Sequence, residues 1–463
     1  MGIVASYMVP HPPLIVPAVG RGGEKEILET TNAYERVASD IAEIAPDTIV
    51  ITSPHSVMYS DYFHISPGDG ATGNLGNFRA PQESFSESYD TVFRDKLVAL
   101  LNRDGFPGGT LGERDRELDH GTMVPLYFIR KHYSSGKIIR IGLSGLPLAD
   151  HYMLGKYIRE VADELGRKTV IVASGDLSHK LKDYGPYGFD PAGPVYDEKI
   201  MDAASRADFG AMLEFDPDLL NASAECGHRS FVIMSGAFDG VDVNAEMLSH
   251  QDVTGVGYGI CIFKPGRENK ERCFLEKMKE KIGGTESSAY VRLARLTIDE
   301  FVRTGRKLVF PDEIPGDLRK DLPSEAAGSR AGAFVSVHKG GMLRGCIGTI
   351  GPVQDSIADE IINNAISAVS RDPRFTPVRE DELGLLDINV DILGEPEDID
   401  GPDKLDVKRY GVIVSCGYKR GLLLPDLEGV DTVDYQISVA MQKGGILPSD
   451  DYKLQRFEVV RYK

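Results

Sequence analysis

Three histidines of this chain follow short apolar runs of the kind that form buried strands. His11 comes after GIVASYMV, His55 after DTIVITS and His179 after KTVIVAS. In an α/β sheet, the crevice beyond the carboxyl ends of the strands is where ligands bind. Three imidazoles delivered to that edge by separate strands can converge on one point. The sequence therefore predicts a metal site there.

A carboxylate is a frequent third ligand where two histidines hold a redox-active metal. Such sets bind Fe(II) on one face and leave positions open for substrate and oxygen. The candidate is Glu225, in SAECGHRSFVIM at the start of a predicted helix, but the adjacent Cys226 could supply a thiolate instead. The sequence leaves this choice open. Fe(II) is the expected ion, and zinc or another divalent metal is the alternative.

The elements that must position these residues alternate between two kinds over residues 1–265. Short apolar runs predict strands at 2–9, 47–53, 137–144, 168–174 and 257–263. Amphipathic stretches predict helices at Glu24–Ala45, Tyr89–Arg103 and His151–Leu165. Strands separated by helices are typical of an α/β domain, and right-handed crossovers place most of the strands parallel. We expect a mixed, mostly parallel sheet flanked by helices.

The composition changes after Phe263. A charged, glycine-punctuated segment predicts a linker helix over 266–285, which separates a first domain, 1–265, from a second, 286–463. The second domain mixes helices with hairpins, which predicts an α+β fold. Its expected elements are helices at 289–305 and 354–370, a strand at 385–393 and hairpins at 333–350 and 411–425.

Composition excludes several partners. The formal net charge of −19 argues against nucleic acid or an anionic membrane as a partner, because both require a basic surface. No run approaches the ~20 apolar residues of a membrane helix. The five cysteines include no CxxC pair, which favours a reducing cytoplasm. A homo-oligomer is compatible with the sequence.

Five short motifs, in order, resemble those of class III extradiol ring-cleavage dioxygenases and of the related Memo family. They are PHPP at 10–13, SPH at 53–55, DHG at 119–121, SGDLSH at 174–179 and ECG at 225–227. The resemblance implies that His11, His55 and Glu225 bind the metal. The likeness of ECG to a Memo segment implies Cys226 in place of Glu225.

The same resemblance implies roles for two further histidines. His179 is similar to the acid/base residue of the dioxygenases, and His120 to a histidine that hydrogen-bonds bound substrate or oxygen. A catechol-like substrate would chelate Fe(II), and His179 would take a phenolic proton. The alternatives are a non-catalytic, Memo-like metal-binding scaffold, a metal-dependent hydrolase, or an oxidation carried out on a peptide partner.

The second domain carries LRGCIGT at 343–349, which resembles the hallmark of the AMMECR domain family. A Memo-like domain joined to an AMMECR domain resembles the proteins of the AmmeMemoRadiSam system, which implies a radical SAM enzyme as a partner. Cys346 beside Arg344 is a candidate nucleophile, because a neighbouring cation favours the thiolate, and His338 is a candidate base. The alternative is that Cys346 packs as a small hydrophobic residue.

Overall fold

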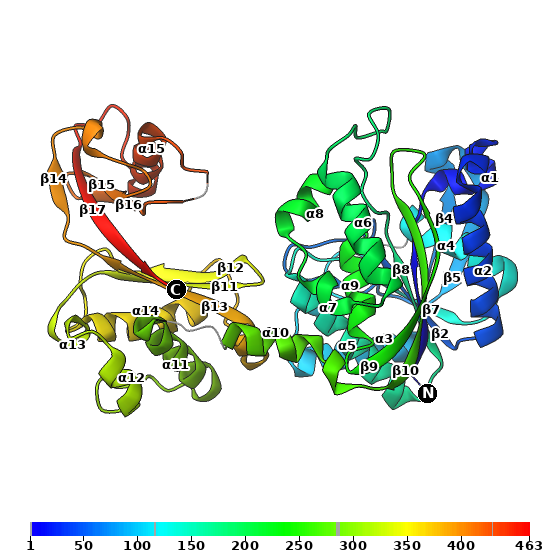
Figure 1. Cartoon of the computed structure of the whole chain (residues 1–463), viewed down its shortest axis with the longest axis horizontal. Coiled ribbons are helices and arrows are strands. Elements are labelled where there is room, and N and C mark those ends of the chain that lie inside the picture. Colours follow the sequence, from blue (N-terminus) through cyan, green and yellow to red (C-terminus); the bar gives the residue numbers. More distant parts are fainter. Residues whose placement is uncertain (1, 115–116, 284–287, 428) are drawn as a thin grey trace. The chain divides into compact units, whose positions relative to one another are not determined.

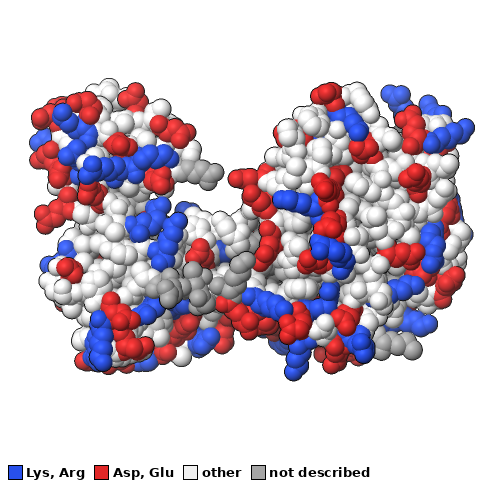
Figure 2. All heavy atoms as spheres, in the orientation of Figure 1, with Lys and Arg blue, Asp and Glu red and all other residues white. Residues whose placement is uncertain are grey.

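The computed structural model describes residues 2–114, 117–283, 288–427 and 429–463. Contacts within the chain define two compact units, Met1–Lys277 and Met278–Lys463. On both units, the face shown in Figure 2 carries acidic and basic side chains intermixed. Among the described residues, no helix has the length and hydropathy needed to cross a membrane.

A six-stranded sheet forms the centre of the first unit (Figure 1). In spatial order its strands are β7 (Lys137–Gly142), β2 (Thr48–Ser53), β8 (Thr169–Ser174), β1 (Ile3–Val9), β10 (Tyr258–Glu268) and β9 (Val241–Gln251). The first four are parallel to one another, whereas β10 pairs antiparallel with β1 and with β9. The predicted mixed, mostly parallel sheet is confirmed.

Helices cover both faces of this sheet (Figure 1). The helices of the unit are α1 (Pro17–Gly20), α2 (Leu28–Ile44), α3 (Thr91–Arg103), α4 (His120–His132), α5 (Leu148–Leu165), α6 (Ala192–Ser205), α7 (Phe209–Leu213), α8 (Pro217–Ser223) and α9 (His228–Gly236). α2 packs with α4 on one face, and α5 packs with α9 on the other. Two small sheets complete the unit: β3 (Phe63–His64) with β6 (Gly108–Gly109), and β4 (Gly70–Leu75) with β5 (Ala80–Ser88).

Burial explains why the central strands are so apolar. β2 and β8 are buried along their whole length, as strands covered on both faces must be. Because β2, β8 and β1 are parallel neighbours, their carboxyl ends lie at one edge of the sheet. His11, His55 and His179 all follow strands that end at this edge.

Helix α10 (Phe274–Gly283) lies inside the segment predicted as a linking helix. Strand β10 continues to Glu268, so the first part of that segment is strand rather than helix. Residues 284–285, at the other end of the predicted linker, lie outside the described part of the chain.

The second unit is built on an antiparallel sheet. Its strands are β11 (Ala333–Lys339), β12 (Met342–Gly348), β13 (Leu386–Leu393), β14 (Glu397–Ile399), β15 (Tyr410–Cys416), β16 (Lys419–Leu423) and β17 (Lys453–Tyr462). Its helices are α11 (Ala289–Thr304), α12 (Gly316–Asp321), α13 (Glu325–Gly328), α14 (Ile357–Ser370) and α15 (Val433–Gly444). The hairpins β11–β12 and β15–β16 are those predicted from the sequence, and the α+β class is confirmed.

Candidate metal centre

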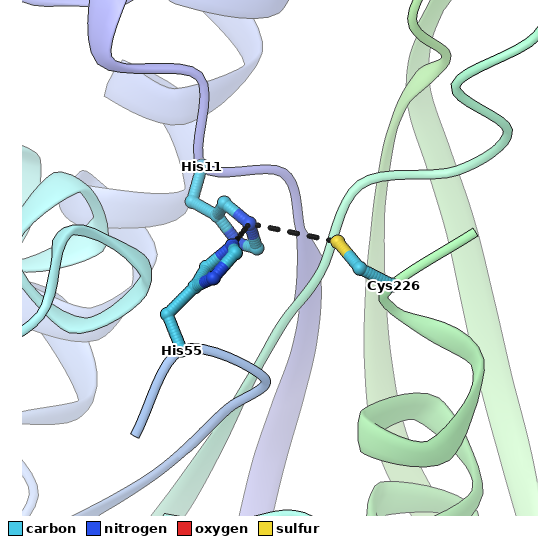
Figure 3. Close-up of side chains that lie close together, drawn as sticks. All are labelled: His11, His55 and Cys226. Carbon is cyan, nitrogen blue, oxygen red and sulfur yellow. Dashed lines mark hydrogen bonds between the residues drawn. The ribbon is translucent and has the colours of Figure 1, made fainter. Parts of the chain in front are cut away.

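Two of the three strand-end histidines face each other at the edge of the sheet. The Nε2 atoms of His11 and His55 are 3.0 Å apart, and the Sγ of Cys226 lies 3.6 Å from His11 Nε2. Figure 3 shows the three side chains converging from separate segments. His11 is buried and His55 is exposed. These three donors are close enough together to share one ion.

The donor separations fit a transition metal. Two ring nitrogens bound at about 2.0–2.1 Å to one ion lie roughly 2.9–3.4 Å apart at bond angles of about 90–110°. A nitrogen and a sulfur bound at about 2.3 Å lie roughly 3.1–3.6 Å apart under the same conditions. The observed separations of 3.0 and 3.6 Å fall within these ranges.

Ser174, the last residue of β8, fixes the tautomer of His11. The Ser174 hydroxyl lies 2.6 Å from the carbonyl oxygen of Gly121, to which it must donate its only proton. It lies 2.9 Å from His11 Nδ1, so it must accept the Nδ1–H of the ring. The Nε2 atom of His11 is therefore unprotonated, with its lone pair directed toward His55 and Cys226.

The Gly121 carbonyl is available to Ser174 because of Pro125. Both residues belong to α4, in which the N–H of position 125 would normally donate to the carbonyl of position 121. Proline has no N–H to donate. The hydroxyl of Ser174 takes the place of that missing donor.

Asp119 ties the start of α4 to the end of β2. As the N-cap of α4, it accepts the N–H of Thr122 at 3.0 Å, and it also accepts the Ser53 hydroxyl at 2.5 Å. Ser53 in turn accepts the backbone N–H of His55 at 3.2 Å. His120, the first residue of α4, lies with its ring centroid 4.0 Å from that of His55. The histidine that is expected to hydrogen-bond substrate or oxygen is therefore adjacent to the candidate ligands.

Asp176 lies between His11 and His179. Its Oδ1 accepts the backbone N–H of His11 at 2.7 Å. Its Oδ2 lies 3.9 Å from His11 Nε2 and 4.0 Å from His179 Nε2. Burial raises the pKa of this carboxyl to about 6. The sequence prediction did not include Asp176, although it belongs to the SGDLSH motif.

His179 adds a ring nitrogen, Nε2, that has no hydrogen-bond partner among the described residues. Its Nε2 atom is buried, and its ring stacks on that of Tyr187 at a centroid distance of 5.0 Å. Burial lowers the pKa of His179, and burial lowers the pKa values of His11 and His120 to about 3. All three rings are therefore neutral at pH 7, as metal ligands and bases must be.

The Glu225 side chain binds the start of helix α9 rather than the histidines. Its Oε2 accepts the backbone N–H of His228 at 2.6 Å, at the start of α9, and burial raises its pKa to about 7. It is not in the group formed by His11 and His55, where the structure places Cys226. Burial raises the pKa of the Cys226 thiol well above its usual value. A bound cation would offset this effect and favour the thiolate.

A cavity of about 630 Å³ opens beside the histidines. His55, Asp119 and His120 line it, together with the segment around Asn74 and Phe78. The ring of Phe78 meets that of His120 edge-on at a centroid distance of 5.2 Å. The cavity offers a planar substrate an aromatic wall next to the converging donors.

In the second unit, the Arg344 side chain pairs with Glu382 and not with Cys346. The Arg344 guanidinium binds Glu382 through two hydrogen bonds of 3.0 Å. Burial alone would raise the pKa of Glu382, but Lys339 and Arg344 outweigh it and lower that pKa to about 2. Cys346 instead accepts the hydroxyl of Ser336 at 3.2 Å. The structure thus does not pair the predicted nucleophile with its predicted cation.

His338, the candidate base, is not the residue paired with Cys346. In the β11–β12 hairpin it lies opposite Leu343, whereas Ser336 lies opposite Cys346. Burial lowers the pKa of His338.

A family model described as the catalytic LigB subunit of aromatic ring-opening dioxygenase matches residues 5–261, more than half of the chain. The chain belongs to the LigB family. A second model, AMMECR1, matches residues 291–463. These matches confirm the resemblance to extradiol dioxygenases and to AMMECR domains, and they show a LigB-type domain fused to an AMMECR1 domain.

Related proteins occur in bacteria and archaea. A Clostridium acetobutylicum protein is 39% identical over 475 residues, which cover 100% of both chains. A Thermotoga maritima protein is 49% identical over 176 residues, 38% of this chain and 97% of the relative. An uncharacterized Pyrococcus horikoshii protein of known structure is 32% identical, covering 38% of this chain and 89% of its own, with a TM-score of 0.34.

Proposed function

We propose that the LigB-type domain is a metal-dependent oxidoreductase of the extradiol ring-cleavage type. Its substrate is catechol-like, and its ion, Fe(II), is held by His11, His55 and Cys226. The observation that carries the proposal is the convergence of these three donors beside a cavity that is lined by His55 and His120. Membership of the LigB family supports it.

Each residue of the site would have its own role in the reaction. A bound Fe(II) ion would supply electron transfer between substrate and oxygen. His179 is neutral at pH 7, and its unpartnered Nε2 can accept a proton from a substrate hydroxyl. His120, whose ring centroid lies 4.0 Å from that of His55, would donate a hydrogen bond to bound substrate or oxygen. The Phe78 wall orients a planar ring in the cavity.

One observation favours a second candidate function. A thiolate third ligand is softer than a carboxylate and suits zinc as well as iron. With zinc, His11, His55 and Cys226 would leave a fourth position for water, and the site would support hydrolysis. Dependence of turnover on oxygen separates the two functions.

Elemental analysis of protein purified without oxygen tests the proposal first. We expect about one ion per chain in the wild type and little in His55→Ala. His132→Ala is a matched control, since His132 pairs with Glu35 on the surface. Oxygen uptake on addition of a catechol to the iron-loaded protein would support ring cleavage. A wild-type protein without stoichiometric metal would contradict the proposal and leave a non-catalytic scaffold. The radical SAM partner stays a prediction.

A further inference from the structure

A second set of metal-ligating side chains lies beside the first. Asp176, His179 and Cys226 bring one ligand atom each to within 4.8 Å of one another. We infer that these residues form a second, weaker position for a soft divalent ion such as Zn²⁺, joined to the first position by the Cys226 sulfur. The inference rests on the proposed metal centre and adds an inhibitory ion to it.

The unsatisfied donors of this second set point into the site. His179 Nε2 is buried and has no hydrogen-bond partner among the described residues. Asp176 is 8% exposed, and its Oδ1 is already occupied by the N–H of His11, which leaves Oδ2 facing the two imidazoles. A buried imidazole nitrogen and a buried carboxylate oxygen both gain from a cation placed between them.

Cys226 can serve both positions. Its Sγ is the atom that the two groups have in common. The backbone N–H of Asp176 donates to this sulfur at 3.3 Å, which stabilises negative charge on it. Thiolates bind zinc and other soft ions, and paired metal ions in proteins sit about 3.5–4 Å apart. A bridging thiolate fits such a pair.

The two groups have different histidines. His55 belongs to the first group and His179 to the second, and the two groups share only Cys226. An ion in the second position would occupy the lone pair of His179 that the proposed function uses as a base. Excess zinc would therefore inhibit.

Equilibrium dialysis against Zn²⁺ or Co²⁺, followed by elemental analysis, tests the second position. We expect the wild type to bind one ion tightly and a second at least about 10-fold more weakly. Asp176→Asn and His179→Ala should keep the first ion and lose the second. His250→Ala is the matched control, because His250 pairs with Asp197 at 3.1 Å outside both groups. With Co²⁺, two ions bridged by one sulfur should also show spin coupling by EPR.

The outcomes are distinct. A wild-type protein that stops at one ion overturns the second position and leaves the proposed function standing. A wild-type protein that binds none removes both. Two ions in the wild type and in both variants would place the second ion elsewhere and refute the assignment. Loss of both ions in both variants would also refute it, because the two positions would then not be separable.

Discussion

Replacement of Ser174 by alanine tests how the site is preorganised. Ser174 gives its proton to Gly121 and accepts the Nδ1–H of His11, so the wild type holds His11 in the tautomer that leaves Nε2 free. Alanine removes both hydrogen bonds, and either ring nitrogen of His11 can then carry the proton. We expect Ser174→Ala to bind metal about 10–100-fold more weakly, as is usual when the partner of a ligating histidine is lost. This corresponds to about 1.4–2.7 kcal/mol.

Competition with a chelator of known affinity measures this loss, and ¹⁵N NMR of the histidine rings reports the tautomer of His11 without metal. Ser174→Thr retains a hydroxyl and should recover much of the affinity. Ser235→Ala is the control, because Ser235 is buried and donates to the Phe231 carbonyl at 2.8 Å in α9. It should cost about 1 kcal/mol of folding stability without weakening metal binding.

The reasoning would be refuted by a Ser174→Ala protein that binds metal as tightly as the wild type and keeps His11 protonated at Nδ1. Pro125→Ala provides an independent test of the same hydrogen bonds. It restores an N–H that competes with Ser174 for the Gly121 carbonyl, which allows the hydroxyl to donate to His11 instead. A mixture of His11 tautomers without loss of helix α4 would support the hydrogen-bond chain from His11 through Ser174 to Gly121.

Three further predictions concern the segments around the third ligand. Cys226→Ser should reduce metal content strongly, whereas Glu225→Gln should retain it; a loss in Glu225→Gln alone would restore the carboxylate as the ligand. Gly175→Ala should destabilise the protein by about 1–3 kcal/mol in chemical denaturation and weaken metal binding, because its Cβ would lie 2.0 Å from the Gly227 Cα. Without metal, Glu225 should lower stability progressively as the pH rises from 4.5 to about 7, because its folded pKa is raised and the unfolded chain releases the proton first. Across that range, the free energy of unfolding of Glu225→Gln should therefore rise by about 1–3 kcal/mol relative to that of the wild type. The same dependence of stability on pH in both proteins would contradict the argument from burial.

The sequence was sufficient for five of the six strands of the central sheet and for the edge at which the candidate site lies. Uninterrupted apolar runs predict β1, β2 and β8, and parallel pairing then requires the residues that follow them to meet. Helix α4 was not predicted, because Pro125 interrupts its pattern. Strand β9 was not predicted either. Its side chains alternate in burial only weakly, as expected of a strand at the edge of a sheet.

The supporting residues of the site could not be predicted in the same way. The roles of Ser174, Asp176 and Asp119 depend on hydrogen bonds between segments that are 53 to 165 residues apart. A local pattern contains no information on such distances. The motifs DHG and SGDLSH did include or adjoin all three residues, so motif membership was the available signal.

The choice between Glu225 and Cys226 depends on packing on both sides of the pair. Glu225 accepts the first backbone N–H of α9, a helix end that would otherwise be unsatisfied. Cys226 faces the other way, where its sulfur accepts the N–H of Asp176. Gly175 and Gly227 pack closely beside the pair, since a Cβ on Gly175 would lie 2.0 Å from the Gly227 Cα. These contacts therefore favour Cys226 over Glu225 as the third ligand of the proposed metal centre.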